Sequence, residues 1–253
     1  MHISAMIIIR SPREIEQLKR SNAIVAEVFE KLKGMILPGI TTKELDQVAE
    51  EYILLKGARP AFKGYRGFPA TLCISINEEV VHGIPGERRL NEGDIVSLDV
   101  GVDFVGYFGD AAITLPVGEV DPEAKRLLEV TEKALYIGIE KAKAGNRLFD
   151  ISYAIQGWVE SHGFSVVRDF VGHGIGRDLH EEPQIPNFGA PHQGPRLEKG
   201  MVFALEPMVN EGTYGVRVLS DGWTVVTADG KRSAHFEHTI AITDDGAEIL
   251  SAL

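Results

Sequence analysis

The amino-acid sequence predicts an α+β fold built from two related halves, and three observations support this prediction. A chain of 253 residues, of which 44% are hydrophobic, is long enough to bury a full core. Segments rich in β-branched and aliphatic residues alternate with longer segments whose apolar residues recur at helical spacing. One helix-and-strand unit also occurs twice along the chain. We therefore expect residues 1–253 to form a single domain with pseudo-symmetric halves at about 11–120 and 121–250.

Four helices are expected from their start signals. Ser11–Glu14 has the pattern of a capping box with proline in the first turn, and a second box follows at Thr41–Glu44. Apolar residues recur at helical spacing after each box. In the second half, Asp121-Pro122 should cap a helix that runs to about Ala144, and a fourth helix should cover residues 149–161.

The fourth helix repeats the apolar pattern of the second. Adding 106 to the apolar positions 45, 48, 49, 52 and 53 gives Ile151, Ala154, Ile155, Trp158 and Val159. Farther along, a strand segment that ends in Asp99 is matched by one that ends in Glu206, at an offset of 107. Two such units related by a pseudo-two-fold axis would bring these two carboxylates near the axis, where we expect the site.

The segment from Leu98 to Asp110 should form a β-hairpin that carries two carboxylates. With a two-residue loop at Phe104-Val105, Asp99 would lie directly opposite Asp110, with Cβ atoms about 5 Å apart. Two carboxylates so placed repel each other unless a proton or a cation lies between them. The hairpin therefore indicates a metal site; the alternative is that Asp110 belongs to a turn and Asp99 points into solvent.

Composition and charge exclude several classes of protein. The net charge of −11 disfavours a nucleic-acid partner, because such binding depends on cationic side chains. Cys73 is the only cysteine, which excludes an intrachain disulfide and a thiolate zinc cluster. The apolar run at residues 6–9 is too short for a signal peptide, and no segment is long enough to span a membrane. We expect a soluble, cytoplasmic monomer that binds neither nucleic acid nor membrane.

Acidic and histidine residues cluster in the second half, around Gly172–Gly176, His180–Pro183, Glu206-Pro207 and His235–His238. Glu181 and Glu182 are expected on a solvated face. His235 and His238 are expected to be structural or on the surface.

Together these residues resemble a type I methionine aminopeptidase, and the resemblance covers nearly the whole chain. The matching segments are 75–78, 81–85, 93–99, 109–110, 172–176, 180–183, 205–207 and 236–239. The resemblance implies one catalytic domain with the pita-bread fold, in which helices lie outside a curved antiparallel sheet. It also implies removal of the N-terminal methionine from nascent or newly made proteins when the second residue is small.

The resemblance further implies a dinuclear metal centre held by Asp99, Asp110, His173, Glu206 and Glu237. Asp110 and Glu237 would bridge the two ions, Asp99 would complete one site, and His173 with Glu206 would complete the other. Four carboxylates and one imidazole suit divalent Co, Mn, Fe or Zn, and ligand chemistry alone does not select among them. A hydroxide between the ions would attack the first peptide bond.

Three side chains are expected to act on the substrate. Glu206 would take the proton of the attacking water and pass it to the leaving amine. His180 would stabilise the developing oxyanion, and His82 would contact the peptide nitrogen on the leaving side.

The resemblance also implies an apolar pocket for the methionine side chain, formed by Phe62, Tyr65, Phe68, Cys73 and Trp223. Aromatic rings and sulfur suit a thioether, although Phe62 and Cys73 could equally belong to the core. Leu179 stands where relatives commonly carry phenylalanine, so the pocket should tolerate norleucine or leucine. Asn77 and Ser233 match a monovalent-cation site of some relatives.

Three alternatives follow from the same residues. A prolidase or aminopeptidase P would carry an additional N-terminal domain, for which the few residues before Ser11 leave no room. A catalytically silent module that binds ribosomes or RNA should have lost ligands and gained basic patches. A single-metal or structural site is the third. Expected partners are N-terminal methionyl peptides and nascent chains, with any association with the ribosome made by the catalytic domain's own surface.

Overall fold

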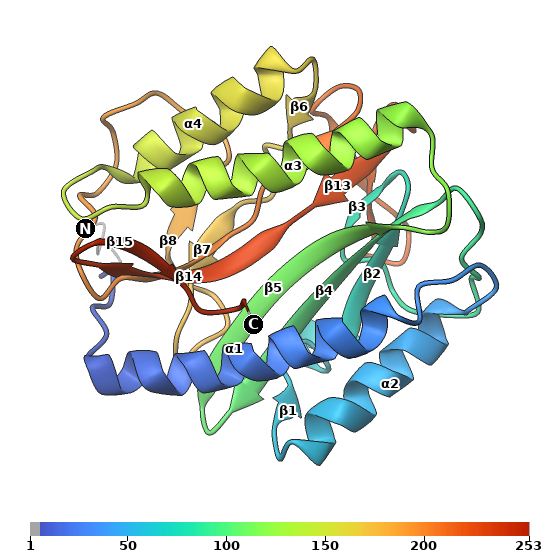
Figure 1. Cartoon of the computed structure of the whole chain (residues 1–253), viewed down its shortest axis with the longest axis horizontal. Helices are drawn as coiled ribbons and strands as arrows, with labels where there is room; N and C mark the ends of the chain where they lie inside the picture. Colours follow the sequence, from blue (N-terminus) through green and yellow to red (C-terminus); the bar gives the residue numbers. More distant parts are fainter. Residues whose placement is uncertain (1–5, 253) are drawn as a thin grey trace.

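A nine-stranded antiparallel sheet forms the centre of the molecule, and four helices lie along it (Figure 1). The computed structural model describes residues 6–252. The strand order is β1-β4-β5-β14-β9-β7-β8, with β2 also paired to β4 and β15 to β14. The strands of this sheet are β1 (Arg59–Pro60), β2 (Leu72–Ile76), β4 (Ile95–Phe104), β5 (Tyr107–Pro116), β7 (Gly172–Gly174), β8 (Glu181–Ile185), β9 (Val202–Leu205), β14 (Glu237–Thr243) and β15 (Gly246–Ile249).

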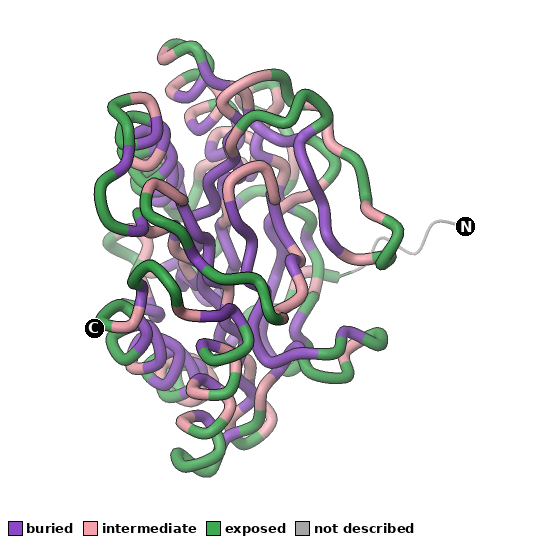
Figure 2. The backbone as a smooth tube through the Cα atoms, turned by 90° about the vertical axis from the view of Figure 1, so that its right-hand side faces the viewer, coloured by how far each residue is buried: buried purple, intermediate pink, exposed green. Residues whose placement is uncertain are grey.

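Two smaller sheets of three strands each complete the β structure. One has the order β13-β10-β6 and the other the order β11-β12-β3. Their strands are β3 (Glu79–Val81), β6 (Ser165–Val166), β10 (Met208–Asn210), β11 (Val216–Val218), β12 (Val225–Thr227) and β13 (Ser233–His235). In Figure 2 the buried strands run through the middle of the molecule, with exposed turns and loops around them. This is the α+β arrangement expected from the sequence.

The helices start where their capping residues stand. α1 (Pro12–Lys33) and α2 (Thr42–Leu55) both begin with complete capping boxes, which confirms that expectation. α3 (Pro122–Lys141) is capped by the Asp121 side chain, which accepts from two backbone amides. The expected end at Ala144 is wrong, because the backbone leaves the helical conformation at Ala142. α4 (Leu148–Ser161) begins one residue before the expected start.

The two helix pairs pack over separate apolar cores. α1 and α2 cover a core with β2, β4 and β5, in which Leu98 and Val100 are fully buried. α3 and α4 cover a second core that includes Phe203 of β9. α2 and α4 have 14 residues each and start 106 positions apart. Each is followed by a glycine with a positive φ angle, Gly57 at 72° and Gly163 at 81°, a conformation that favours glycine after a helix.

The β4–β5 hairpin has a different register from the one expected. Phe104 pairs with Tyr107, so the turn is Val105-Gly106 rather than Phe104-Val105. Val105 has a φ angle of 57° and Gly106 one of 76°, the backbone of a type I′ turn. Asp103 Oδ1 accepts from Gly106 N at 2.9 Å and stabilises this turn.

The register change moves the two carboxylates of the hairpin apart by two positions. Asp99 lies opposite Ala112, and Asp110 lies opposite Gly101. The direct pairing of Asp99 with Asp110 was therefore wrong. Because side chains alternate between faces with a period of two, both aspartates still project from the same face of the sheet.

The turn offers a test of this register. Val105 is 70% exposed and is β-branched, so its positive φ angle is strained. We expect Val105→Asn to raise the free energy of unfolding by about 1 kcal/mol, because asparagine tolerates this conformation. Urea denaturation measures the change. The same substitution at the exposed Val218 of β11, whose φ angle is not positive, should give no gain; equal gains at both positions would contradict the turn.

Candidate functional site

Five adjacent strands of the large sheet each bring one metal-binding type of side chain to the same region. In sheet order these are β4 with Asp99, β5 with Asp110, β14 with Glu237, β9, whose end is followed by Glu206, and β7 with His173. The residues span 99–237 in sequence, and the strand order alone makes them neighbours. The sheet therefore brings together all five residues that the sequence suggested as metal ligands.

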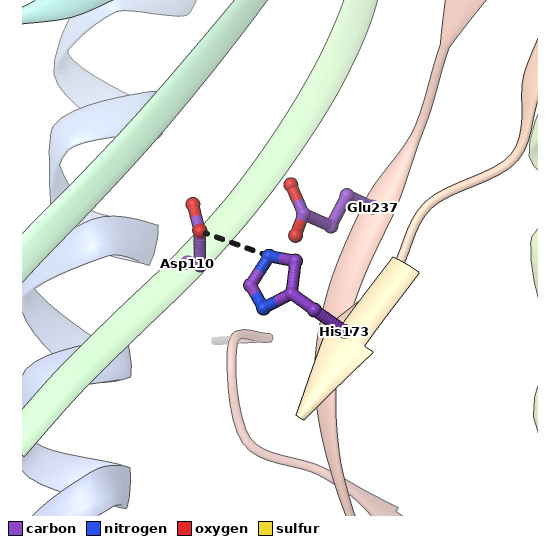
Figure 3. A group of neighbouring side chains, drawn as sticks. All are labelled: Asp110, His173 and Glu237. Carbon is purple, nitrogen blue, oxygen red and sulfur yellow. Dashed lines mark ion pairs between the residues drawn. The ribbon is translucent and has the colours of Figure 1, made fainter. Parts of the chain in front are cut away.

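The centre of this group is compact. Ligand atoms of Asp110, His173 and Glu237 all lie within 4.8 Å of one another, and Figure 3 shows the three side chains pointing toward a common point. His173 Nε2 is 3.8 Å from Asp110 Oδ2 and 3.6 Å from Glu206 Oε1. His173 Nδ1 donates to the carbonyl of Gly174 at 2.9 Å, which leaves Nε2 free to act as a ligand.

The buried carboxylates lack donors. Asp99 Oδ1, Asp110 Oδ1 and Glu237 Oε1 are buried and have no hydrogen-bond partner. Within residues 6–252, Asp110 and Glu206 form ion pairs with histidines only, and Asp99 and Glu237 form no ion pair. A buried acceptor without a donor is costly unless a cation or a proton satisfies it. The donor set of oxygens and one imidazole fits divalent transition-metal ions.

Burial and mutual repulsion disfavour the charged form of every carboxylate in the group. Burial raises the pKa of Asp99 and that of Glu206 to about 7 each. Burial, followed by the negative charges of its neighbours, raises the pKa of Asp110 well above its ordinary value, and the same holds for Glu237. The metal-free group therefore retains protons that bound cations would displace.

The two other histidines expected to contact the substrate lie in loops beside this group. His180 is exposed, and its ring lies 4.2 Å from that of His173, centroid to centroid. His180 Nδ1 is 3.0 Å from the hydroxyl of Tyr65. His82 follows β3 with a φ angle of 60°. Removal of water by the surrounding protein lowers the pKa of His82 and that of His180 to about 4, so both rings are neutral at pH 7.

A single pocket connects the histidines with the carboxylates. The expected substrate-binding side chains all line it, with Phe68 packed edge-on against Trp223 at 5.2 Å. Leu179 forms part of the wall and is almost fully buried. The residues lining the pocket are Phe62, Tyr65, Arg66, Phe68, Cys73, His82, Asp99, Asp110, His173, Leu179, His180, Glu206, Trp223 and Glu237.

Sequence reasoning missed two residues near the site. His235 is buried, and its Nε2 has no hydrogen-bond partner and lies 3.6 Å from Glu206 Oε2. In the sequence, only its position two residues before Glu237 indicated that it lies near the site. Arg66 lines the pocket and has a φ angle of 49°, which sequence patterns do not reveal.

The expected solvated face at Glu181 is wrong. Its side chain is 8% exposed and forms an ion pair with Arg10, 171 positions away, whereas Glu182 is exposed as expected. His238 is structural, and its Nδ1 lies 2.7 Å from Ser251 Oγ. It follows Glu237 in β14, so its side chain lies on the opposite face of that strand.

The polar groups of Asn77 and Ser233 are engaged within the protein. Asn77 Oδ1 accepts from Ile95 N, and Asn77 Nδ2 donates to Asp94 Oδ1 at 2.8 Å. Ser233 N donates to the Asn77 carbonyl at 2.8 Å, and Ser233 Oγ donates to the Val209 carbonyl. The monovalent-cation site stays a prediction.

The raised carboxyl pKa values can be tested in the metal-free protein. The pKa of Asp110 is raised in the folded state, so its carboxyl keeps a proton there at pH values above 3.8. In the unfolded chain, where its pKa has the ordinary value of 3.8, the same carboxyl loses that proton. Folded stability should therefore fall as pH rises, and Asp110→Asn should remove this loss. We expect the variant to be more stable by roughly 1–3 kcal/mol at pH 8 and unchanged near pH 4, measured by urea denaturation with a chelator.

Asp121→Asn is the matched control, because its effect on stability at pH 8 should have the opposite sign. The side chain of Arg232 lowers the pKa of Asp121 to about 2, so losing this carboxylate should destabilise the protein at pH 8. A loss of stability at pH 8 for Asp110→Asn would contradict the repulsion within the buried group.

Comparisons with known proteins agree with this geometry. The model of metallopeptidase family M24 matches residues 16–244. Methionine aminopeptidase 1 of Bacillus subtilis is 58% identical over 97% of this chain and 99% of its own length. The crystal structure of methionine aminopeptidase from Thermotoga maritima has a TM-score of 0.97 at 51% identity and covers 98% of this chain and 100% of that chain.

A more distant likeness concerns the fold alone. Prolidase from Pyrococcus furiosus has a TM-score of 0.80 at 23% identity, and the match covers 97% of this chain but 66% of the prolidase. The fold is thus the pita-bread fold expected from the sequence. The chain belongs to metallopeptidase family M24 and, within it, to the methionine aminopeptidases.

Proposed function

We propose that this chain removes N-terminal methionine from peptides whose second residue is small, with two divalent ions held by the five ligands on adjacent strands. The observation that carries the proposal is the convergence of Asp99, Asp110, His173, Glu206 and Glu237 around buried oxygens that have no donor. The pocket lined by apolar side chains opens onto the same group.

The order of the strands supports the assignment of bridging ligands. Asp110 and Glu237 come from β5 and β14, which lie between β4 on one side and β9 and β7 on the other, and would contact both ions. Asp99 lies on one side of this pair, whereas Glu206 and His173 lie on the other, so each side would complete one ion site. Bound ions, whether Co, Mn, Fe or Zn, would polarise the scissile carbonyl and activate the attacking water.

The pocket fits an unbranched thioether side chain. Phe68 and Trp223 provide aromatic edges, and sulfur packs favourably against such edges. Burial and the nearby carboxylates raise the pKa of the Cys73 thiol, so Cys73 contributes a neutral sulfur to the wall. Phe62 and Tyr65 complete the lining beside the carboxylates, toward which the peptide amine would point.

Hydrolysis adds the hydroxyl of water to the carbonyl carbon and moves a proton to the leaving nitrogen. Glu206, whose pKa is about 7 in the metal-free chain, would carry this proton. His180 has Nδ1 occupied by Tyr65, so its Nε2 would donate to the developing oxyanion. His82, a neutral ring that meets Phe170 and Trp223 edge-on, would contact the leaving peptide nitrogen.

The substrates would include nascent chains, met in the cytoplasm by a monomer whose own surface makes any contact with the ribosome. A monovalent cation near Asn77 and Ser233 would support the loop before β3. No helix among residues 6–252 has the length and apolar character needed to cross a membrane.

The roles of the two histidines can be tested separately from metal binding. Because neither ring is among the five metal ligands, His82→Ala and His180→Ala should lower kcat on a Met-Ala-Ser peptide by about 10²- to 10³-fold. Metal analysis of the purified variants should still find two ions per chain, as in the parent protein. Loss of both ions from either variant, or an unchanged kcat, would overturn the assigned role.

Leu179 provides a test of the pocket. Its side chain is smaller than phenylalanine, so the parent protein should cleave peptides that begin with leucine or norleucine more readily than Leu179→Phe does. We expect the substitution to lower the ratio of kcat/KM for Leu-Ala-Ser over that for Met-Ala-Ser by about 10-fold. An unchanged ratio would show that Leu179 does not set the pocket's tolerance.

A further inference from the structure

We infer that Arg10, which precedes α1, is a positioning residue that holds His180 in place through a buried ion pair with Glu181. The inference rests on the role proposed above for His180, which immediately precedes Glu181 in the chain. Neither Arg10 nor Glu181 lines the substrate pocket. Their effect on catalysis would therefore be transmitted through the backbone of the loop that carries His180.

The ion pair is buried and uses both carboxylate oxygens of Glu181. Arg10 Nη2 donates to Oε2, and the two side chains are only 4% and 8% exposed. Oε1 accepts from the backbone amides of Arg177 at 2.8 Å and Asp178 at 3.1 Å. One carboxylate thus closes the turn at residues 177–181 and links it to the segment before α1.

Arg10 is itself fixed at further points, and one of them is an ion pair between its Nη1 and Glu14 Oε1 at 3.7 Å. Its backbone N donates to the Gly200 carbonyl at 2.8 Å, and Gly200 N donates to Ile242 of β14. Its guanidinium fills the space above Gly176, where a Cβ atom would clash with it. The guanidinium therefore lies against the start of the 177–181 turn. The Arg10 backbone is bonded to Gly200, two residues before β9.

His180 depends on this turn for its position. Its ring stacks against that of Tyr65 and lies beside that of His173, and the residue is exposed. Placing a charged pair in a protein interior costs solvation that apolar residues of similar size would not cost. The pair is thus poorly explained by stability alone, whereas it does fix the turn beside His180.

A double-mutant cycle tests the inference. We would measure kcat, KM and bound metal on a Met-Ala-Ser peptide for Arg10→Met, His180→Ala and the double variant. A misplaced catalytic group commonly costs about 10- to 100-fold in rate, so Arg10→Met should lower kcat by that factor with KM and metal content nearly unchanged. In the His180→Ala background, Arg10→Met should cause no further loss, because the group that it positions is absent.

Two further variants keep the test decisive if Arg10→Met folds poorly. Glu181→Gln keeps an oxygen for the amides of Arg177 and Asp178 but removes the charge, and should lower kcat in the same His180-dependent way. Arg10→Ala should regain part of its kcat when guanidinium ion is added, because the ion can occupy the vacated site. His180→Ala should show no such rescue.

Arg232→Met is the matched control. Arg232 is partly buried and pairs with Asp121 and Glu211, away from the pocket. Its loss should lower the melting temperature without lowering kcat.

The outcomes distinguish a failure of the positioning role of Arg10 from a failure of the role proposed for His180. If His180→Ala is impaired but the Arg10 and Glu181 variants are not, or if their losses are equal in both backgrounds, the positioning role is overturned. If His180→Ala retains the parent kcat, the proposed role of His180 fails, and the inference fails with it.

Discussion

The burial of four carboxylates side by side, with no ion pair to a lysine or arginine among residues 6–252, is the constraint on which this structure depends. Asp99, Asp110, Glu206 and Glu237 each lose water on folding, and each repels the others. In the metal-free chain, protons must offset this cost, whereas divalent cations offset it when they are bound. The same repulsion that weakens the metal-free protein therefore favours cation binding, and the apolar cores on either side must stabilise the fold against it.

The strand order explains how one sheet can hold such a group. Asp99 ends the matching segment of the first half and Glu206 that of the second, so equivalent positions of two similar units flank Asp110 and Glu237. Asp110 and Glu237 occupy the adjacent strands β5 and β14, where the halves meet. Each helix pair has its own apolar core, and a third apolar cluster, which includes Phe62, Ile175 and Val202, joins residues of both halves.

Local sequence signals predicted this structure well wherever a few neighbouring residues determine the outcome. Both capping boxes formed, because Ser11 and Thr41 satisfy amide groups only three residues away. The predicted register of the hairpin was wrong by two residues, because Val105 accepts a positive φ angle that a β-branched residue normally avoids. The shift preserved the face of the sheet, so the candidate site survived an error in pairing.

Contacts between distant segments lay beyond the sequence. The ion pair between Arg10 and Glu181 joins residues 171 positions apart, and neither has a local pattern that suggests burial. His235 likewise lies beside Glu206 because β13 pairs with β10, in which Met208 lies opposite His235. From the sequence alone, such residues could be assigned only to the surface or the core, by the usual preference of their residue type.

The site divides its tasks between rigid and less rigid parts of the fold. The five candidate metal ligands project from strands, or from the end of a strand, in the middle of the sheet, where neighbouring strands hold each backbone on both sides. His82 and His180 instead lie in loops, which must be fastened by other means. The loop of His82 is held by the Gly83 amide, which donates to Ser75 Oγ, and by the Gly83 carbonyl, which accepts from Ile74. The loop of His180 is held by Glu181 in a similar way, so the positions of both rings depend on residues that do not line the pocket.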